Sequence, residues 1–223
     1  IARVLDVGED GGTYVAVFDH LFGTELTGLM EAERKRRGEV PLSPAVRVVS
    51  AVLDALAYAH QACGDDGAPL RLVHRDVSAR NVQVGYDGGV ELTGFGLAKH
   101  QAQSEHTSYG VVRGQLAYLS PEQIRGQDLD ARSDLWATGV LLYQLLTGVL
   151  PFDRQGEFHI LKAIREEPHR PPSALRKGLP GPLDGFFDRA LAKDRAGRFA
   201  SAAEMQQALV DAAGPGTRGA LAD

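Results

Sequence analysis

The residues best suited to chemistry lie in one short run, His74-Arg75-Asp76-Val77-Ser78-Ala79-Arg80-Asn81. A histidine, an arginine and an aspartate follow one another, and an asparagine lies five positions after the aspartate. Four residue types at fixed offsets arise by chance about once in 10^5 positions, so the run indicates a functional site. Proteins use such side chains to transfer protons, neutralise charge and bind metal ions.

The run lies between a predicted long helix and a predicted hairpin, and these elements must position it. Ser43-Pro44 is typical of a helix start, and apolar residues continue at helical spacing to about Ala62. After the run, apolar stretches at 82–84 and 90–92 flank the turn sequence Tyr86-Asp87-Gly88-Gly89. The sequence therefore predicts a loop fixed at both ends by regular structure.

A second hairpin is predicted for residues 1–22, around Gly11-Gly12. A lone hairpin is marginal in water, so we expect its partners in sequence that precedes Ile1. Residues 99–115 show little periodicity and are expected to form a long functional or disordered loop. Helices are predicted at 133–148, 156–167, 183–192 and 201–213. This order predicts an α+β fold with the helices gathered toward the C-terminal side.

The composition is that of an ordinary soluble globular domain, with 223 residues, 43% hydrophobic and 24% charged. The net charge of -5 argues against nucleic acid as the main partner. The basic run 34–37 lies among glutamates, and we interpret it as a solvated helix end rather than a nucleic-acid or membrane patch. A single cysteine, Cys63, suits a reducing compartment, and a cytoplasmic location is expected. The longest apolar run, around 140–150, is too short to span a bilayer, so no membrane contact is expected within the chain.

Further motifs follow the first run in a fixed order. Together with His74–Asn81, which matches the catalytic loop H-R-D-x-x-x-x-N, they resemble the protein-kinase family. Ser120-Pro121-Glu122 resembles the A-P-E that closes the activation segment, and Asp134 opens a stretch that resembles the central helix. Arg198 resembles the arginine that pairs with the A-P-E glutamate. Residues 73–81, together with 84–88, resemble bacterial serine/threonine kinases in particular, and the whole resemblance covers essentially 1–212.

The resemblance implies a protein-kinase-like fold with three parts. Residues 1–22 would be the last hairpin of the N-lobe and the hinge, 23–212 the C-lobe, and 213–223 a disordered tail or linker. The Gly-rich phosphate loop, the strand lysine and its partner glutamate are expected upstream of Ile1. We therefore expect residues 1–223 alone to be inactive and poorly soluble.

The resemblance also implies the chemistry. Asp76 would be the base that accepts the proton of a substrate hydroxyl, and Asn81 would be a magnesium ligand. Arg80 would supply positive charge near the transferred phosphate, because Ser78 replaces the lysine that serine/threonine kinases usually carry. ATP and Mg²⁺ are the implied cofactors, and a protein is the implied substrate or regulatory partner. Structural or regulatory roles are implied for His74, Arg75, Phe95, Gly96, Glu122, Asp134 and Arg198.

The nucleotide pocket is placed by the same resemblance. Phe18 would guard its back, and the backbone of a hinge that includes Asp19 and Leu21 would meet adenine. Gln83 stands where the family usually has an apolar residue under the adenine ring, and a polar amide packs less well there.

One departure from the family pattern bears directly on catalysis. The run Thr93-Gly94-Phe95-Gly96 stands where the family has D-F-G, so Gly94 occupies the metal-ligand position. Glycine brings no carboxylate, and the divalent ion would lose its main protein anchor. Gln115 replaces a threonine that serine/threonine kinases usually carry.

Two functional hypotheses remain open, together with a minor third. The chain could come from an ATP-dependent protein serine/threonine kinase impaired by Gly94, or from a pseudokinase that keeps the fold as a non-catalytic binding or regulatory module. The third is an unrelated α+β protein that carries the motif by chance. Thr107 and Ser108 are candidate phosphorylation sites of the activation segment, or else solvated loop residues.

Overall fold

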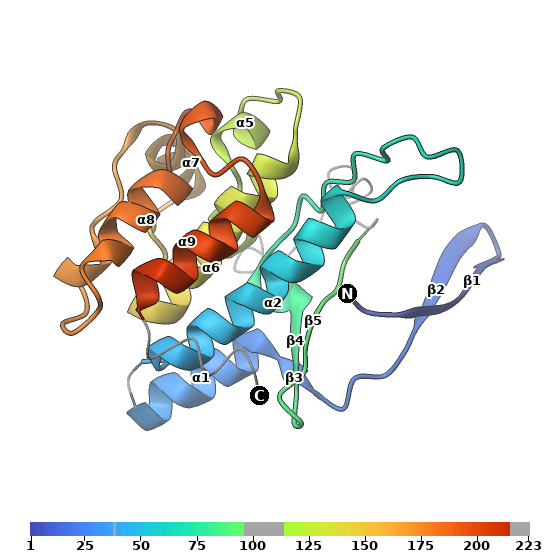
Figure 1. Cartoon of the computed structure of the whole chain (residues 1–223), viewed down its shortest axis with the longest axis horizontal. Helices are drawn as coiled ribbons and strands as arrows, with labels where there is room; N and C mark the ends of the chain where they lie inside the picture. The colour runs from blue at the N-terminus through green and yellow to red at the C-terminus, as the bar shows by residue number, and fades with distance from the viewer. Residues whose placement is uncertain (38, 96–113, 215–223) are drawn as a thin grey trace.

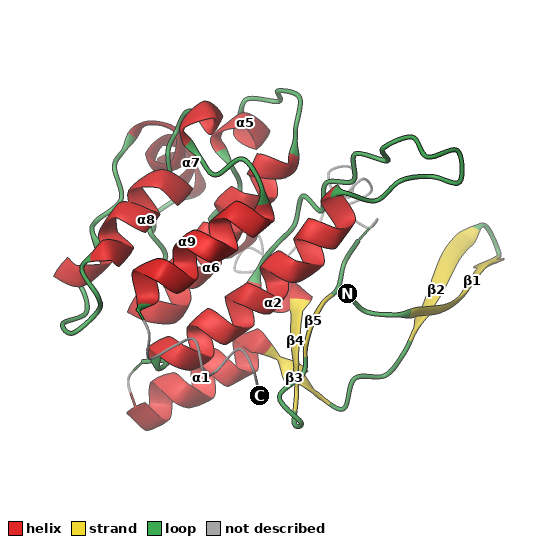
Figure 2. Ribbon diagram, in the orientation of Figure 1, coloured by secondary structure: helices red, strands yellow, loops and turns green. Residues whose placement is uncertain are grey.

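The computed structural model describes residues 1–37, 39–95 and 114–214 (Figure 1). The strands are β1 (Val4–Asp10), β2 (Thr13–Phe18), β3 (Gly23–Glu25), β4 (Val82–Gly85) and β5 (Val90–Leu92). The helices are α1 (Leu26–Arg37), α2 (Leu42–His60), α5 (Pro121–Ile124), α6 (Ala131–Thr147), α7 (Glu157–Glu166), α8 (Pro182–Ala190) and α9 (Ala202–Ala213), with short 3-10 turns at η1 (Ala79–Asn81), η2 (Pro172–Ala174) and η3 (Arg195–Gly197). Figure 2 shows a helical body with strands at one side, which confirms the predicted α+β class.

Helix α6 runs through the middle of the body. The side chain of Asp130 accepts a hydrogen bond from the amide of Arg132 at its N-terminus, and Gly148, with φ of 71°, ends it in the left-handed conformation. Trp136 is fully buried and stacks on Phe152. Apolar residues surround this helix on all sides, as its sequence predicts, because α2, α8 and the turn η2 cover it.

Helix α2 is long and apolar enough to cross a bilayer by length and composition, unlike the expectation that no stretch approaches that size. It nevertheless packs against α6 and α9, and 56% of its most apolar window is buried inside the protein. Val46, Val49 and Leu56 are completely buried there. These contacts are those of a core helix.

The three-stranded antiparallel sheet has the order β3-β4-β5. Strand β3 pairs with β4 through Gly23↔Gly85 and Thr24↔Val84. A Cβ at Gly23 would lie 2.2 Å from the carbonyl oxygen of Val84, so only glycine permits this approach. The polar triplet of β3 carries no apolar alternation, and for this reason the sequence did not predict the strand.

Of helix α1, the sequence predicted only the C-terminal end, from the basic run 34–37. Arg34, Lys35 and Arg36 are exposed near its C-terminus, which confirms the interpretation as a solvated helix end. Cations at this end also interact favourably with the helix dipole.

The hairpin of β1 and β2 is antiparallel, as predicted, with an irregularity between Val4 and Asp6. Every residue of both strands is exposed, and Figure 1 shows the hairpin standing away from the helical body. A backbone hydrogen bond from Ala2 N to Leu92 O, 3.1 Å long, joins the segment before β1 to the end of β5.

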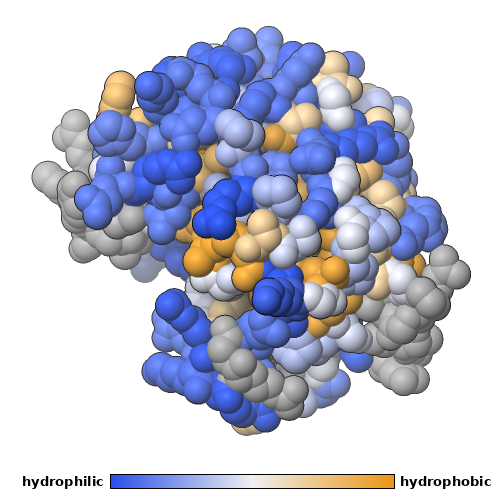
Figure 3. All heavy atoms as spheres, turned by 90° about the vertical axis from the view of Figure 1, so that its left-hand side faces the viewer, coloured by the Kyte–Doolittle hydropathy of each residue, from blue (hydrophilic) through white to orange (hydrophobic). Residues whose placement is uncertain are grey.

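The C-terminal helices agree with their predicted ranges. Ser201 caps α9 by accepting a hydrogen bond from Glu204 N (3.1 Å), and Glu204 accepts one from the amide of Ala200 (2.7 Å). Helix α9 ends at Ala213, within the range predicted as tail, and the rest of that tail from residue 215 lies outside the described residues. The face shown in Figure 3 is mostly hydrophilic, with apolar side chains gathered near its middle.

Candidate active site

The backbone of the predicted catalytic loop is held by Asp134, in the first turn of α6. Asp134 is 1% exposed, and its two carboxylate oxygens accept the amide protons of His74 and Arg75, each at 2.8 Å. Nε2 of His60, on α2, lies 2.8 Å from the same carboxylate. Arg75 has a φ of 69°, which residues other than glycine rarely adopt. These hydrogen bonds to a buried carboxylate stabilise that unusual backbone conformation.

His74 joins the loop to the end of β5. The amide of Asp76 donates to Nδ1 of His74 (3.3 Å), which assigns the ring proton to Nε2, and Nε2 donates to the carbonyl of Thr93 (2.7 Å). Its ring packs against that of Phe95 in a T-shaped arrangement, with centroids 4.5 Å apart. These contacts join His74 to Asp76, Thr93 and Phe95, and the structural roles implied for His74 and Phe95 stay a prediction.

The carboxylate of Asp76 lies among side-chain amides. Nδ2 of Asn81 donates to its Oδ2 (2.9 Å) and to the carbonyl of Asp76 (2.6 Å). Nε2 of Gln115 lies 3.2 Å from both carboxylate oxygens. The amide of Thr93, the residue that follows β5, donates to the carbonyl of Asn81 (2.8 Å) and also holds Asn81 in place. The structure thus brings together the predicted base and the predicted metal ligand, and it adds Gln115, whose contact with Asp76 the sequence did not predict.

Gly94 adjoins this cluster with a φ of 88°. A Cβ built on it would lie 3.2–3.3 Å from the carboxamide atoms of Asn81. A side chain at position 94 would therefore project toward Asn81, where an added carboxylate could share a metal ion with the amide oxygen. Because residue 94 is glycine, it contributes no carboxylate, and only the neutral amide of Asn81 is present beside it.

The residues present do not fit a tightly held Mg²⁺, which prefers several oxygen ligands in near-octahedral geometry. Within the described ranges, no group of three or more His, Cys, Asp or Glu side chains could hold a metal ion. Asn81 alone remains as the metal ligand implied by sequence.

Glu122 and Arg198 form a buried ion pair, as predicted. Two nitrogens of the guanidinium donate to the two carboxylate oxygens at 2.7 and 2.9 Å, and Ser133 Oγ donates to Glu122 Oε1 at 2.7 Å. Burial would raise the pKa of the Glu122 carboxyl, but the hydrogen bonds and charge of Arg198, with Ser133, lower it to about 2. The pair ties α5 to the segment before α9 and stabilises the end of the activation segment.

The predicted nucleotide-pocket residues lie on or near β2 and β4. Phe18 ends β2 and is 42% exposed, and the amide of Asp19 donates to the carbonyl of Arg3 (2.8 Å). Leu21 lies against Gly85, and Gln83 is half-buried on β4. In the part of the chain that the structure describes, no hydrogen bond or ion pair links these four predicted residues to Asn81 or Gly94, so their nucleotide role stays a prediction.

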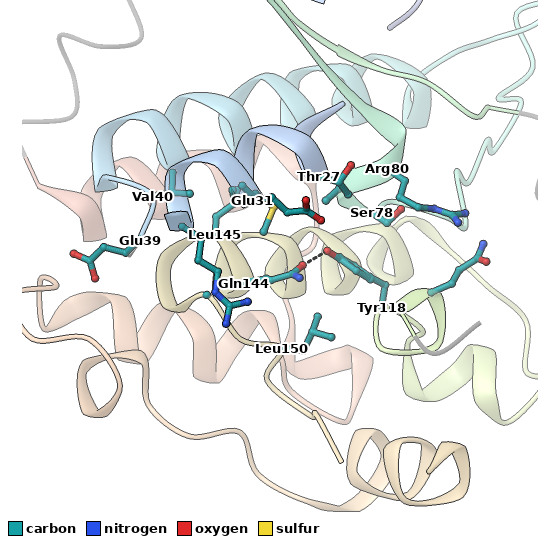
Figure 4. Close-up of a pocket in the computed structure, with 16 residues that line it drawn as sticks. Thr27, Glu31, Glu39, Val40, Ser78, Arg80, Tyr118, Gln144, Leu145 and Leu150 are labelled. Carbon is teal, nitrogen blue, oxygen red and sulfur yellow. Dashed lines mark hydrogen bonds between the residues drawn. The ribbon is translucent and has the colours of Figure 1, made fainter. Parts of the chain in front are cut away.

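A cavity of about 350 Å³ opens beside the catalytic loop, between α1, α6 and the residues before α5 (Figure 4). Arg80, which is exposed, lines it together with Ser78 and Gln115. Tyr118 and Gln144 point toward one another across it and share a hydrogen bond. The predicted residues Gly96, Thr107 and Ser108 lie outside the described residues.

The fold and this site define the C-lobe arrangement of an enzyme class that transfers phosphoryl groups from ATP. The family model described as "Protein kinase domain" matches residues 1–210. The chain therefore belongs to the protein kinase family, whose members generally use ATP and Mg²⁺ and act on proteins.

Similar proteins are bacterial kinases. The chain is 34% identical over 209 residues to the tyrosine-protein kinase MasK of Myxococcus xanthus, covering 94% of this chain and 32% of that protein. It is 37% identical over 205 residues to the serine/threonine-protein kinase PknL of Mycobacterium tuberculosis, covering 92% of this chain and 48% of the relative. The crystal structure of the PknI kinase domain of Mycobacterium tuberculosis matches with a TM-score of 0.67 and 30% identity, over 92% of this chain and 68% of that one. The chain thus spans a third to a half of the length of these curated relatives.

Proposed function

We propose that the protein is an ATP-dependent protein kinase, of the serine/threonine type, whose magnesium-dependent phosphoryl transfer is weakened by Gly94. The observation that carries this proposal is the position of Gly94, which faces the carboxamide of Asn81 without a carboxylate. The presence of Asp76 and Asn81 supports a site built for transfer, and Gly94 would weaken the binding of a metal ion there.

The chain's own residues would act by positioning and by charge. Asp76, held by the amide of Asn81, would accept the proton of a substrate hydroxyl. Arg80 is exposed at the turn before Asn81 and would add positive charge near the transferred group. Asp134 and His74 would keep the loop in its productive conformation, because they bind its backbone directly. MgATP would supply the phosphoryl group.

The alternative is a pseudokinase that keeps the fold as a binding or regulatory module. The same glycine favours it, since loss of a metal-ligand carboxylate removes chemistry without disturbing the buried Glu122–Arg198 pair or the loop. The type of hydroxyl that accepts the phosphate has two candidates, because PknL is described as a serine/threonine kinase and MasK as a tyrosine kinase.

Gly94→Asp in the full-length protein tests the proposal. Aspartate is among the few residues that tolerate positive φ, and its carboxylate would lie beside Asn81. We expect Mg²⁺-dependent ATP affinity, measured by titration calorimetry, to rise about tenfold, and phosphate transfer to myelin basic protein to rise with it.

Gly94→Ala is the matched control, because it adds the same Cβ strain without a carboxylate. It should leave ATP affinity unchanged or lower. Equal transfer by the natural protein and Gly94→Asp would show that Gly94 does not limit the chemistry. No transfer by either protein, with no gain in ATP affinity, would favour the pseudokinase. Phosphoamino-acid analysis of the product identifies the acceptor hydroxyl.

We also propose a cytoplasmic location and a protein partner or substrate. The single cysteine, which is free and exposed, is compatible with a reducing compartment. Cell fractionation followed by immunoblotting tests the location, and recovery of the protein in an extracellular fraction would contradict it.

A further inference from the structure

Gln115 covers the carboxylate of Asp76. Its Nε2 lies 3.2 Å from Oδ1 and 3.2 Å from Oδ2, so one amide group spans both oxygens. The nitrogen must face the carboxylate, because the amide oxygen would be repelled there. Asn81 supplies another donor to Oδ2 at 2.9 Å. A substrate hydroxyl has to come within hydrogen-bond distance of one of these oxygens to lose its proton.

We propose that Gln115 is a gate over Asp76: its carboxamide occupies the approach to the carboxylate and must swing away before a hydroxyl can donate there. The inference rests on the proposed role of Asp76 as the base. Gln115 is thereby a residue that regulates access to the base and takes no part in the chemistry.

In this proposal, Ser78 receives the amide of Gln115 when it withdraws from Asp76. Gln115 and Ser78 line the same cavity of about 350 Å³, which leaves room for the side chain of Gln115 to move. Ser78 is 4% exposed, and its Oγ has no hydrogen-bond partner among the residues that the structure describes. A buried hydroxyl without a partner is unfavourable, and the carboxamide of Gln115 could pair with it. The gate therefore has two positions, one on Asp76 and one on Ser78.

The charges decide which position is preferred at rest. On Asp76 the amide makes charge-assisted hydrogen bonds, which are stronger than a bond to a neutral hydroxyl. The closed position is therefore the major one, and the open position is a minor state that an acceptor can select. Removing Gln115 opens the site, whereas removing the hydroxyl of Ser78 disfavours the open state.

The accessibility of Asp76 can be measured without ATP or Mg²⁺. We suggest coupling of glycine ethyl ester to carboxylates by a carbodiimide, with mass spectrometry to follow each aspartate in the full-length protein. Gln115→Ala should raise the labelling rate of Asp76 by on the order of tenfold, and Ser78→Ala should lower it. Gln115→Thr, a second variant with a shorter side chain, should also raise it.

Two controls separate the gate from general loosening. Exposed Asp87 should label equally in all variants, and Gln127→Ala, the same change at an exposed glutamine, should leave Asp76 unaffected. An unchanged rate for Asp76 in both Gln115 variants overturns the proposal, and an unchanged or faster rate in Ser78→Ala overturns the second position. Failure of Gly94→Asp to gain ATP affinity would count against the proposed function and leave this result intact.

Discussion

Glu122 and Arg198 illustrate how single residues hold this domain together. Their side chains are 3% and 0% exposed, and both carboxylate oxygens are bonded to the guanidinium. Arg198 also donates to the carbonyls of Ala192 and Arg132, at 2.8 and 3.2 Å. A buried ion pair stabilises a fold only when its remaining donors find partners, and here they do.

The Glu122 carboxyl makes stability depend on acid pH. Its pKa of about 2 in the folded protein lies below the ordinary value of 4.5, so its contribution is fully present above about pH 4.5 and is lost as the pH falls toward 2. Between pH 5.5 and 3 we expect this group to lower the free energy of unfolding by about 2 kcal/mol. Urea titrations of the natural protein and Glu122→Gln measure the difference, and parallel pH profiles for the two proteins would contradict it.

At the scale of elements, α6 is the support of the site. Its first turn carries Asp134, which fixes the loop, and Ser133, which bonds Glu122. One buried helix thereby positions both the catalytic loop and the end of the activation segment. The site is built on a rigid element, although its chemistry lies in loops.

Replacing Asp134 tests this support. Asp134→Ala leaves the amides of His74 and Arg75 without their acceptor and removes the partner of His60, and each lost partner costs about 1–3 kcal/mol. We expect a loss of at least about 3 kcal/mol in unfolding free energy and hydrogen exchange faster by on the order of 100-fold at both amides. Asp134→Asn keeps one oxygen acceptor and should show a smaller effect. Unchanged exchange at His74 and Arg75 in Asp134→Ala would show that the loop does not depend on α6.

The same elements show what the sequence could predict. The long helices and both hairpins follow from apolar periodicity and turn residues, and the H-R-D run, Glu122, Asp134 and Arg198 follow from motif order. Strand β3 could not be predicted, because its polar triplet is defined by pairing with β4, far along the chain. The contact of Gln115 with Asp76 could not be predicted either, since it depends on how the chain folds between positions 76 and 115. The sequence marked position 115 only as a departure from the family.

For the whole molecule, the β1–β2 hairpin is the exposed part. Val7 is 65% exposed and Tyr14 79%, and the register places both on one face of the ribbon. Among the residues that the structure describes, no further strand pairs with this ribbon. A two-stranded ribbon with apolar side chains and open edges is a surface that associates with other chains. This geometry supports the expectation of poor solubility for residues 1–223.

Polar substitutions on that face should reduce the association. Val7→Thr combined with Tyr14→Thr keeps residues suited to strands and removes apolar surface, so light scattering of residues 1–223 should show a lower mean mass at the same concentration. Phe158→Thr is the matched control, because Phe158 is 70% exposed on α7 in the helical body. If the natural 1–223 chain is already monodisperse, or if Phe158→Thr lowers the mass as much as the double variant, the hairpin is not the cause.

The positive φ of Arg75 limits which residues the catalytic loop tolerates at this position. A glycine would adopt its φ of 69° without the steric conflict that a Cβ creates. The chain instead keeps a long, exposed cation, whose guanidinium forms no ion pair with any residue that the structure describes. Arginine at this position has a less favourable backbone conformation than glycine would have, but its long side chain carries a positive charge into solvent. A glycine at position 75 would relax the loop and lose the positive charge that it extends into solvent.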